Sequence, residues 1–278
     1  MGGQRGKRFL ALATLALAVV GLGRALPATA RDREDLEAAR EAYAKAAGST
    51  ERPRAAMRLG FLLLQRATSR DAASRQAPVP DRAAPSTAAE LTEAAQLFRE
   101  VAAAGGKQAD EGEGGVIATL LVRGPAGAAD LNAEIQRLQQ GRRGVDPFLC
   151  MAMRDLLRGR SHDTVLAASD LINDHVHAFL PAAPYLVSTR VSNPERVSSP
   201  LPGYPEQARR AKLRGHVTFQ AVLDTRGQVA DFLVLGPGPF SLADAAANAL
   251  RRWTYRPALL DGRPVPVCTQ PIITFDVQ

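Results

Sequence analysis

The spacing of apolar residues changes once along the chain, close to residue 200. Between residues 31 and 180, apolar side chains recur every three or four positions, as they do on one face of an α-helix; Leu36, Ala39 and Tyr43 show this spacing. The pattern predicts an all-α region. We expect either a tetratricopeptide-like array of helix pairs or a plain helical bundle, because no period of about 34 residues recurs cleanly.

Glycine and proline mark the ends of helices within this region. The glycine-rich segment over residues 105–115 is expected to break one helix, and Asp146 with Pro147 is expected to open another. His175 and His177 are two positions apart on an expected helix and therefore point to different faces. We interpret them as part of a solvated helix face and not as a metal-binding pair.

Prolines are dense between residues 181 and 203. This density excludes a helix and predicts an extended connector with polyproline character. The apolar spacing is helical before the connector and alternating after it. We therefore expect two independently stable regions, residues 31–180 and 204–278, joined by the connector.

Beyond the connector, apolar and polar residues alternate, as in β-strands with one buried face. Val217, Phe219 and Ala221 define a first strand, and the segment Asp224–Gly227 suits a hairpin turn into a second. A last strand is expected over residues 272–277, after a helix.

That helix carries an apolar stripe at helical spacing, which ends at Trp253. We interpret Trp253 as a core side chain and not as a ligand platform. The order helix, two strands, helix, strand predicts an α+β domain over residues 204–278. Its three-stranded antiparallel sheet is expected to be packed by two helices.

The amino terminus has the features of an export segment. Basic residues precede an apolar run, Phe9–Leu22, and Ala28–Ala30 has the small-x-small pattern that signal peptidase cleaves. We expect a cleaved signal peptide over residues 1–30, the alternative being a short uncleaved membrane anchor. In both cases the rest of the protein is exported.

The net charge of +7 over 278 residues first suggests a nucleic-acid partner. Four basic residues lie in the first 30, however, and without them 31 basic residues stand against 28 acidic ones, a net charge of +3. The remaining charges are interspersed and form no basic stripe. The charge pattern therefore does not favour nucleic acid.

The sequence contains no recognisable catalytic motif. Gly-x-Ser-x-Gly, His-Glu-x-x-His and Cys-x-x-Cys are absent, and the four histidines are scattered. We therefore expect no enzyme activity, no cofactor and no metal site.

The two cysteines lie in different predicted regions. Cys150 stands between Phe148 and Met151, which predicts a buried apolar thiol. An oxidising compartment allows a disulfide between Cys150 and Cys268. Each cysteine would then have to face the other region, so we expect them to remain unpaired.

A set of short motifs recurs at specific spacing after the connector. They are Tyr204-Pro205-x-x-Ala208, Gly215-x-Val217, Asp224-x-x-Gly227-x-Val229, Trp253-x-Tyr255-x-Pro257-Ala258, Gly262-x-Pro264-Val265 and Ile273-Thr274-Phe275. In this combination they resemble the TonB carboxy-terminal domain family. The resemblance covers residues 204–278.

The resemblance implies a periplasmic module, free or tethered to the inner membrane, that binds outer-membrane receptors. In TonB, such a module couples the inner-membrane ExbB–ExbD motor to receptors that import siderophores, cobalamin and similar cargo. It takes up a short extended receptor segment, the TonB box, as an added strand.

Two features of this chain depart from the family pattern. The apolar run over residues 9–22 is short and has no histidine to contact a motor, and helices with a short connector replace the long proline-rich spacer. The binding role therefore carries over better than the energy-transducing role. The alternative function is a non-energised cell-envelope adaptor that uses its helical region for protein–protein contacts.

The last strand is the expected recognition edge. Pro264, Pro266 and Pro271 precede it, and proline is tolerated in sheets mainly at edges. Unpaired backbone groups there offer a template for an extended peptide. The alternatives are that the connector, or a second copy forming a homodimer, covers this edge.

Alternate side chains of this strand are expected on opposite faces of the sheet, with Ile273, Phe275 and Val277 toward the helices. With the first motif included, the expected partner-binding residues are Tyr204, Pro205, Ile272, Ile273, Thr274, Phe275, Asp276 and Val277.

Overall fold

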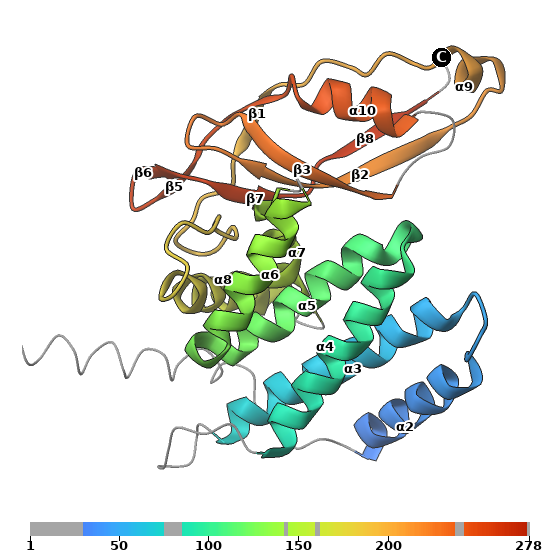
Figure 1. The fold of residues 1–278 in the computed structure, drawn as a ribbon. Coiled ribbons are helices and arrows are strands. Elements are labelled where there is room, and N and C mark those ends of the chain that lie inside the picture. The colour runs from blue at the N-terminus through green and yellow to red at the C-terminus, as the bar shows by residue number, and fades with distance from the viewer. Residues whose placement is uncertain (1–29, 75–84, 142–143, 159–161, 237–241, 277–278) are drawn as a thin grey trace, which may run out of the picture.

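A computed structural model describes residues 30–74, 85–141, 144–158, 162–236 and 242–276 (Figure 1). The signal peptide or anchor expected over residues 1–30 lies outside the described residues, apart from Ala30. Among the helices that the structure describes, none is long and apolar enough to cross a membrane.

The described chain up to residue 177 is helical. Its elements are α2 (Ala30–Lys45), α3 (Arg52–Ser74), α4 (Pro85–Ala104), η2 (Gly106–Gln108), α5 (Ala109–Arg123), η3 (Gly124–Gly127), α6 (Ala128–Gln140), α7 (Asp146–Asp155) and α8 (His162–His177). Consecutive helices pack together from α2 to α5, and α7 packs on α5. The expected all-α region is thus present. Whether it is a tetratricopeptide-like array or a plain helical bundle stays a prediction.

Glycines allow α4 and α5 to approach closely. A Cβ atom on Gly112 would lie 2.7 Å from the backbone nitrogen of Ala102, and one on Gly115 would lie 2.5 Å from the Phe98 ring. Both contacts are shorter than real Cβ atoms make. The helix break expected over residues 105–115 is therefore wrong in its second half, because α5 already begins at Ala109 and its glycines serve packing.

The rest of the described chain is rich in strands. Its elements are β1 (Glu195–Ser198), α9 (Glu206–Arg210), β2 (Gly215–Leu223), β3 (Val229–Gly236), α10 (Leu242–Leu250), β4 (Thr254–Arg256), β5 (Ala258–Leu260), β6 (Arg263–Val265), β7 (Val267–Thr269) and β8 (Ile272–Phe275). In the main sheet, β3 pairs antiparallel with one side of β2, and β7 and β8 pair antiparallel with the other side. The expected three-stranded sheet is therefore wrong in its strand count, because β7 adds a fourth strand. Two further pairs, β1–β4 and β5–β6, were not expected from the sequence either.

Helices lie on both sides of the main sheet. In Figure 1, α10 covers the upper face, and α7 of the helical region reaches the lower face. Val222 of β2 and Phe148 of α7 belong to one buried cluster at this lower interface. Phe219, Leu242 and other side chains on the α10 side form a second cluster.

A disulfide joins the two regions across the lower interface. Cys150 of α7 and Cys268 of β7 are bonded, and both are buried. The expectation of unpaired thiols is therefore wrong. Because α7 docks against the sheet, the two cysteines point into the same interface, which the sequence pattern did not predict.

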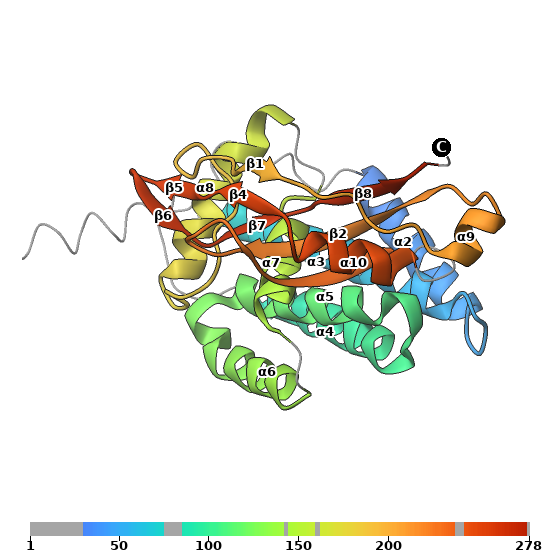
Figure 2. The same ribbon diagram turned by 90° about the horizontal axis from the view of Figure 1, so that it is seen from above.

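The connector over residues 181–203 is extended but is not a free spacer. Its β1 segment pairs with β4 and lies beside it in Figure 2. Val191 forms a bridge with Leu260, and Tyr185 forms a parallel bridge with Val267. The connector therefore lies along the strand-rich region. Independent stability of the two regions stays a prediction.

Candidate functional site

β7 and β8 follow one another along the same side of β2 and keep one register. Ala221 lies opposite Thr269, and Val217 lies opposite Ile273. Between these pairs, the amide of Phe219 donates a 3.0 Å hydrogen bond to the carbonyl of Pro271. Residues 267–275 therefore run as one line beside β2, with Pro271 between the two strands.

The hydrogen bond at Pro271 fixes which backbone groups face outward. Backbone groups of successive strand residues point to opposite sides, so those of Ile273 and Phe275 face β2, as Pro271 does. Those of Ile272, Thr274 and Asp276 then point away from β2. Within the described residues, β8 pairs with β2 alone. We take this outward side of residues 272–276 as the candidate site and refer to it as the β8 edge.

Side chains along the β8 edge alternate between buried and exposed. Ile273 and Phe275 are 3% and 2% exposed, and they pack in the cluster beneath α10. Ile272 is 55% exposed, and Thr274 and Asp276 are exposed as well. The two faces are as expected for these five residues, while Val277 lies outside the described residues.

Tyr204 joins the site through Phe275. The two rings meet edge to face, with centroids 5.5 Å apart. The Tyr204 hydroxyl is buried without a hydrogen-bond partner among the described residues. Pro205 is the residue before α9, and its carbonyl accepts a hydrogen bond from the Arg209 amide, so its visible role is in that helix.

The connector occupies the neighbouring half of the same sheet edge. We call residues Ala183–Leu186 the strap. The Tyr185 amide donates to the Pro266 carbonyl at 2.9 Å, and the Cys268 amide donates to the Tyr185 carbonyl at 2.8 Å. One alternative considered for this edge was coverage by the connector. Among the described residues, the backbone of the connector pairs with β7 and does not pair with β8. The proline density of the connector did not predict this pairing.

The two histidines near the end of α8 are not on a solvated face, and that interpretation is wrong. Nε2 of His175 lies 2.9 Å from the carbonyl oxygen of Leu121. His177 has its Nδ1 2.8 Å from the Asn173 carbonyl and its Nε2 2.9 Å from the Ala183 carbonyl. Both rings therefore hold backbone in place. Among the described residues, no cluster of three or more potential metal ligands occurs.

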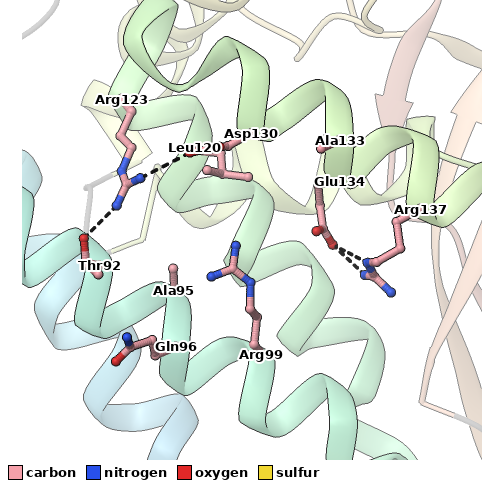
Figure 3. A pocket seen from close by; sticks show the side chains of 10 residues that line it. All are labelled: Thr92, Ala95, Gln96, Arg99, Leu120, Arg123, Asp130, Ala133, Glu134 and Arg137. Atoms are coloured by element: carbon pink, nitrogen blue, oxygen red, sulfur yellow. Dashed lines mark hydrogen bonds and ion pairs between the residues drawn. The ribbon is translucent and has the colours of Figure 1, made fainter.

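A groove lies between α4, α5 and α6, away from the β8 edge (Figure 3). It is an open groove of about 410 Å³ that three arginines line. Arg123 pairs with Thr92 at 2.9 Å and Asp130 at 3.7 Å, and Arg137 pairs with Glu134 on the same helix. Its charges are thus largely paired within the groove.

Arg137 also reaches out of the groove to a buried carboxylate. It pairs with Glu113 of α5, whose pKa is raised because burial disfavours its charged form. This ion pair ties α6 to α5. The contacts of Arg123 and Arg137 therefore explain these charged side chains as links within and between helices, without a bound ligand.

Comparisons with known proteins concern the carboxy-terminal part of the chain. Residues 200–277 match the model of the family described as Gram-negative bacterial TonB protein C-terminal. Protein TonB of Vibrio cholerae serotype O1 is 35% identical over 77 residues, which are 27% of this chain and 32% of that protein. The chain thus spans about a third of the length of this relative.

A solved structure is also similar to part of the chain. The solution NMR structure of the Pseudomonas aeruginosa TonB CTD matches with 18% sequence identity and a TM-score of 0.28. The match covers 33% of this chain and 90% of that one.

Proposed function

Because residues 200–277 belong to the TonB carboxy-terminal domain family, we propose that this protein binds segments of outer-membrane receptors by strand addition at the β8 edge. In this proposal it acts in the periplasm, either free or tethered to the inner membrane, and supports energy-coupled transport across the outer membrane. The partner segment is the TonB box of a TonB-dependent receptor.

The observation that carries the proposal is the outward direction of the backbone at Ile272, Thr274 and Asp276. These residues present N–H and C=O groups for which β8 has no partner strand among the described residues. Such an edge pairs with an extended peptide, whose main-chain hydrogen bonds supply affinity. The exposed Ile272 side chain adds an apolar contact for the incoming strand.

The disulfide supports an exported location. Cys150 and Cys268 are bonded, and disulfides persist in oxidising compartments such as the periplasm. An ExbB–ExbD-type motor is the energy source that the family implies. Engagement of that motor depends on residues 1–29, which lie outside the described residues.

The proposal is tested by removing one outward amide. Thr274→Pro deletes the N–H that a partner strand needs, while the inward bonds of β8 to β2 remain. Thr274→Ala is the matched control, since it keeps the amide and changes only the exposed side chain. Titration with a synthetic TonB-box peptide should shift the amide signals of residues 272–276 in the wild type and the Ala variant but not in the Pro variant.

The titration tests strand addition only if the Thr274→Pro variant remains folded. The Pro variant should keep the circular dichroism spectrum and the cooperative unfolding of the wild type. A folded Pro variant that binds the peptide as tightly as the Ala variant would exclude strand addition at β8.

A non-energised envelope adaptor is the second candidate. The observation that favours it is the broad contact between α7 and the sheet, which places the helical region beside the TonB-like domain. In this case an envelope partner contacts α2–α6. Peptide-induced shifts confined to those helices, with none in residues 272–276, would favour the adaptor.

A further inference from the structure

The strap lies on the same sheet edge as the proposed receptor site. We propose that it is a built-in strand that closes the β7 half of this edge and thereby limits a bound receptor segment to the β8 half. This inference rests on the proposed function, and it concerns which length of partner the site accepts.

The β7 half and the β8 half form one continuous edge. The residues whose backbone groups point away from β2 alternate in the same register along both strands. Pro266 and Cys268 point their backbone groups toward the strap, and Ile272 and Thr274 lie at the same parity further along. The strap runs parallel to β7. The backbone of Tyr185 therefore already forms, through two hydrogen bonds, the kind of pairing that a partner strand would form with this edge.

The other side of the strap is held by one side chain of α8. Nδ2 of Asn173 donates to the Leu186 carbonyl at 2.9 Å, and the Leu186 amide donates to Oδ1 of Asn173 at 2.8 Å. Asn173 is 2% exposed and Leu186 is 4% exposed. Moving the strap would leave the buried Asn173 amide without partners, which opposes its release.

His177 fixes the strap from a second direction. Its ring is stacked on the Tyr185 ring, with centroids 3.7 Å apart and planes inclined by 16°. Its Nε2 also contacts the Ala183 carbonyl. Asn173 and His177 lie one helical turn apart on α8, so a single helix positions both ends of the strap.

The strap occupies the position beside β7 that a longer partner strand would need. Neighbouring strands lie about 4.8 Å apart, so a strand paired with β8 meets Tyr185 if it continues along β7. The free part of the edge, residues 270–276, spans roughly 23 Å at about 3.3 Å per residue. A partner longer than this gains no further backbone pairing while the strap is in place.

Two peptides test this limit on the full chain with its disulfide intact. One is a short TonB-box peptide that spans the whole free part of the edge, residues 270–276, and the other is the same peptide lengthened at both ends with alternating threonine and valine. Both should bind the wild type with equal affinity and protect the Ile272 and Thr274 amides from hydrogen exchange. Protection of Cys268 should not change.

In the Asn173→Ala variant, the binding affinity should depend on the length of the peptide. In the free variant the Cys268 amide should exchange faster, and the lengthened peptide should bind about tenfold tighter than the short one, because about two more backbone hydrogen bonds become available. His177→Ala, which removes the stacked ring, should show the same trend. Asn132→Ala, at an exposed position on α6, is the matched control and should behave as the wild type.

The outcomes separate the two claims. The strap does not limit the bound segment if the lengthened peptide binds the wild type about tenfold tighter than the short one. The same conclusion follows if the affinity of neither α8 variant depends on peptide length. If neither peptide protects Ile272 and Thr274 in the wild type, strand addition itself fails and the strap inference fails with it.

Discussion

The indole nitrogen of Trp253 donates a 3.2 Å hydrogen bond to the carbonyl of Pro200, so the core of the carboxy-terminal domain is bonded to the connector. Trp253 is 5% exposed, and the guanidinium of Arg196 lies 4.9 Å from the centre of its ring. The expectation of a buried core side chain is confirmed.

Trp253→Ala should lower the free energy of unfolding by about 3–5 kcal/mol, because it removes a large buried side chain and leaves a cavity. Trp253→Phe keeps most of the ring volume and should cost less. Urea denaturation followed by circular dichroism measures both values. A loss below about 1 kcal/mol for the Ala variant would contradict the central role of this side chain.

The double variant Cys150→Ala/Cys268→Ala should be less stable by about 5 kcal/mol in the chain-entropy estimate, because the disulfide closes a loop of 118 residues in the unfolded chain. Chemical denaturation at equal protein concentration measures the difference. Reductant should destabilise the wild type and leave the double variant unaffected. Equal stability of the two proteins under oxidising conditions would rule out a stabilising role for the bond.

Asp155→Asn should raise stability at neutral pH. Burial raises the pKa of Asp155 from its ordinary value of 3.8 to about 6, although Arg158 pairs with it at 2.7 Å. Oδ2 of Asp155 has no hydrogen-bond partner among the described residues. The folded state therefore favours the protonated acid, and the charged form is costly above the folded-state pKa.

Proton linkage determines how the contribution of Asp155 to stability changes with pH. Because the folded-state pKa is raised, the contribution of Asp155 to stability is present at low pH and is lost as pH rises from 3.8 through about 6. The Asn variant should gain about 1–3 kcal/mol over the wild type at pH values above this window, and less below it. Denaturation across the pH range tests this, with exposed Asp35→Asn as control; a gain independent of pH would contradict the explanation.

Gly112→Ala should destabilise the protein despite the better helix propensity of alanine. The new methyl group would lie 2.7 Å from backbone atoms of Ala102 and Phe98, which cannot move aside without shifting α4. The gain of about 1 kcal/mol in propensity is then outweighed by a larger packing penalty, for a net loss of about 1–2 kcal/mol. Gly203→Ala, whose methyl group meets open space, is the control, and thermal denaturation compares the two.

Local signals in the sequence predicted much of the fold. The hairpin turn over residues 224–227 joins β2 to β3, and Gly227 has a φ of 77°, in the left-handed region that glycine adopts at such a turn. Alternating burial of Ile273 and Phe275 against Ile272 and Thr274 follows equally from a two-residue period. Such features depend only on neighbours in the chain.

Features that depend on distant partners could not be predicted in this way. The pairing of Cys150 with Cys268 depends on how α7 docks against the sheet, and no local pattern records that docking. Proline density showed that the connector is not helical, but the partner of Tyr185 is set by Asn173 and β7. Gly112 suggested a helix break, since composition does not distinguish a breaking glycine from one that fits a close helix contact.

The disulfide also determines how tension would travel through the molecule. A pull on the β8 edge reaches Cys268 within a few residues and passes through the bond directly into α7. The intervening chain, a contour of roughly 400 Å at about 3.4 Å per residue, lies inside a covalent ring and cannot be drawn out while the bond is intact. Under tension this part of the protein therefore behaves as a short, stiff link and not as an extensible tether.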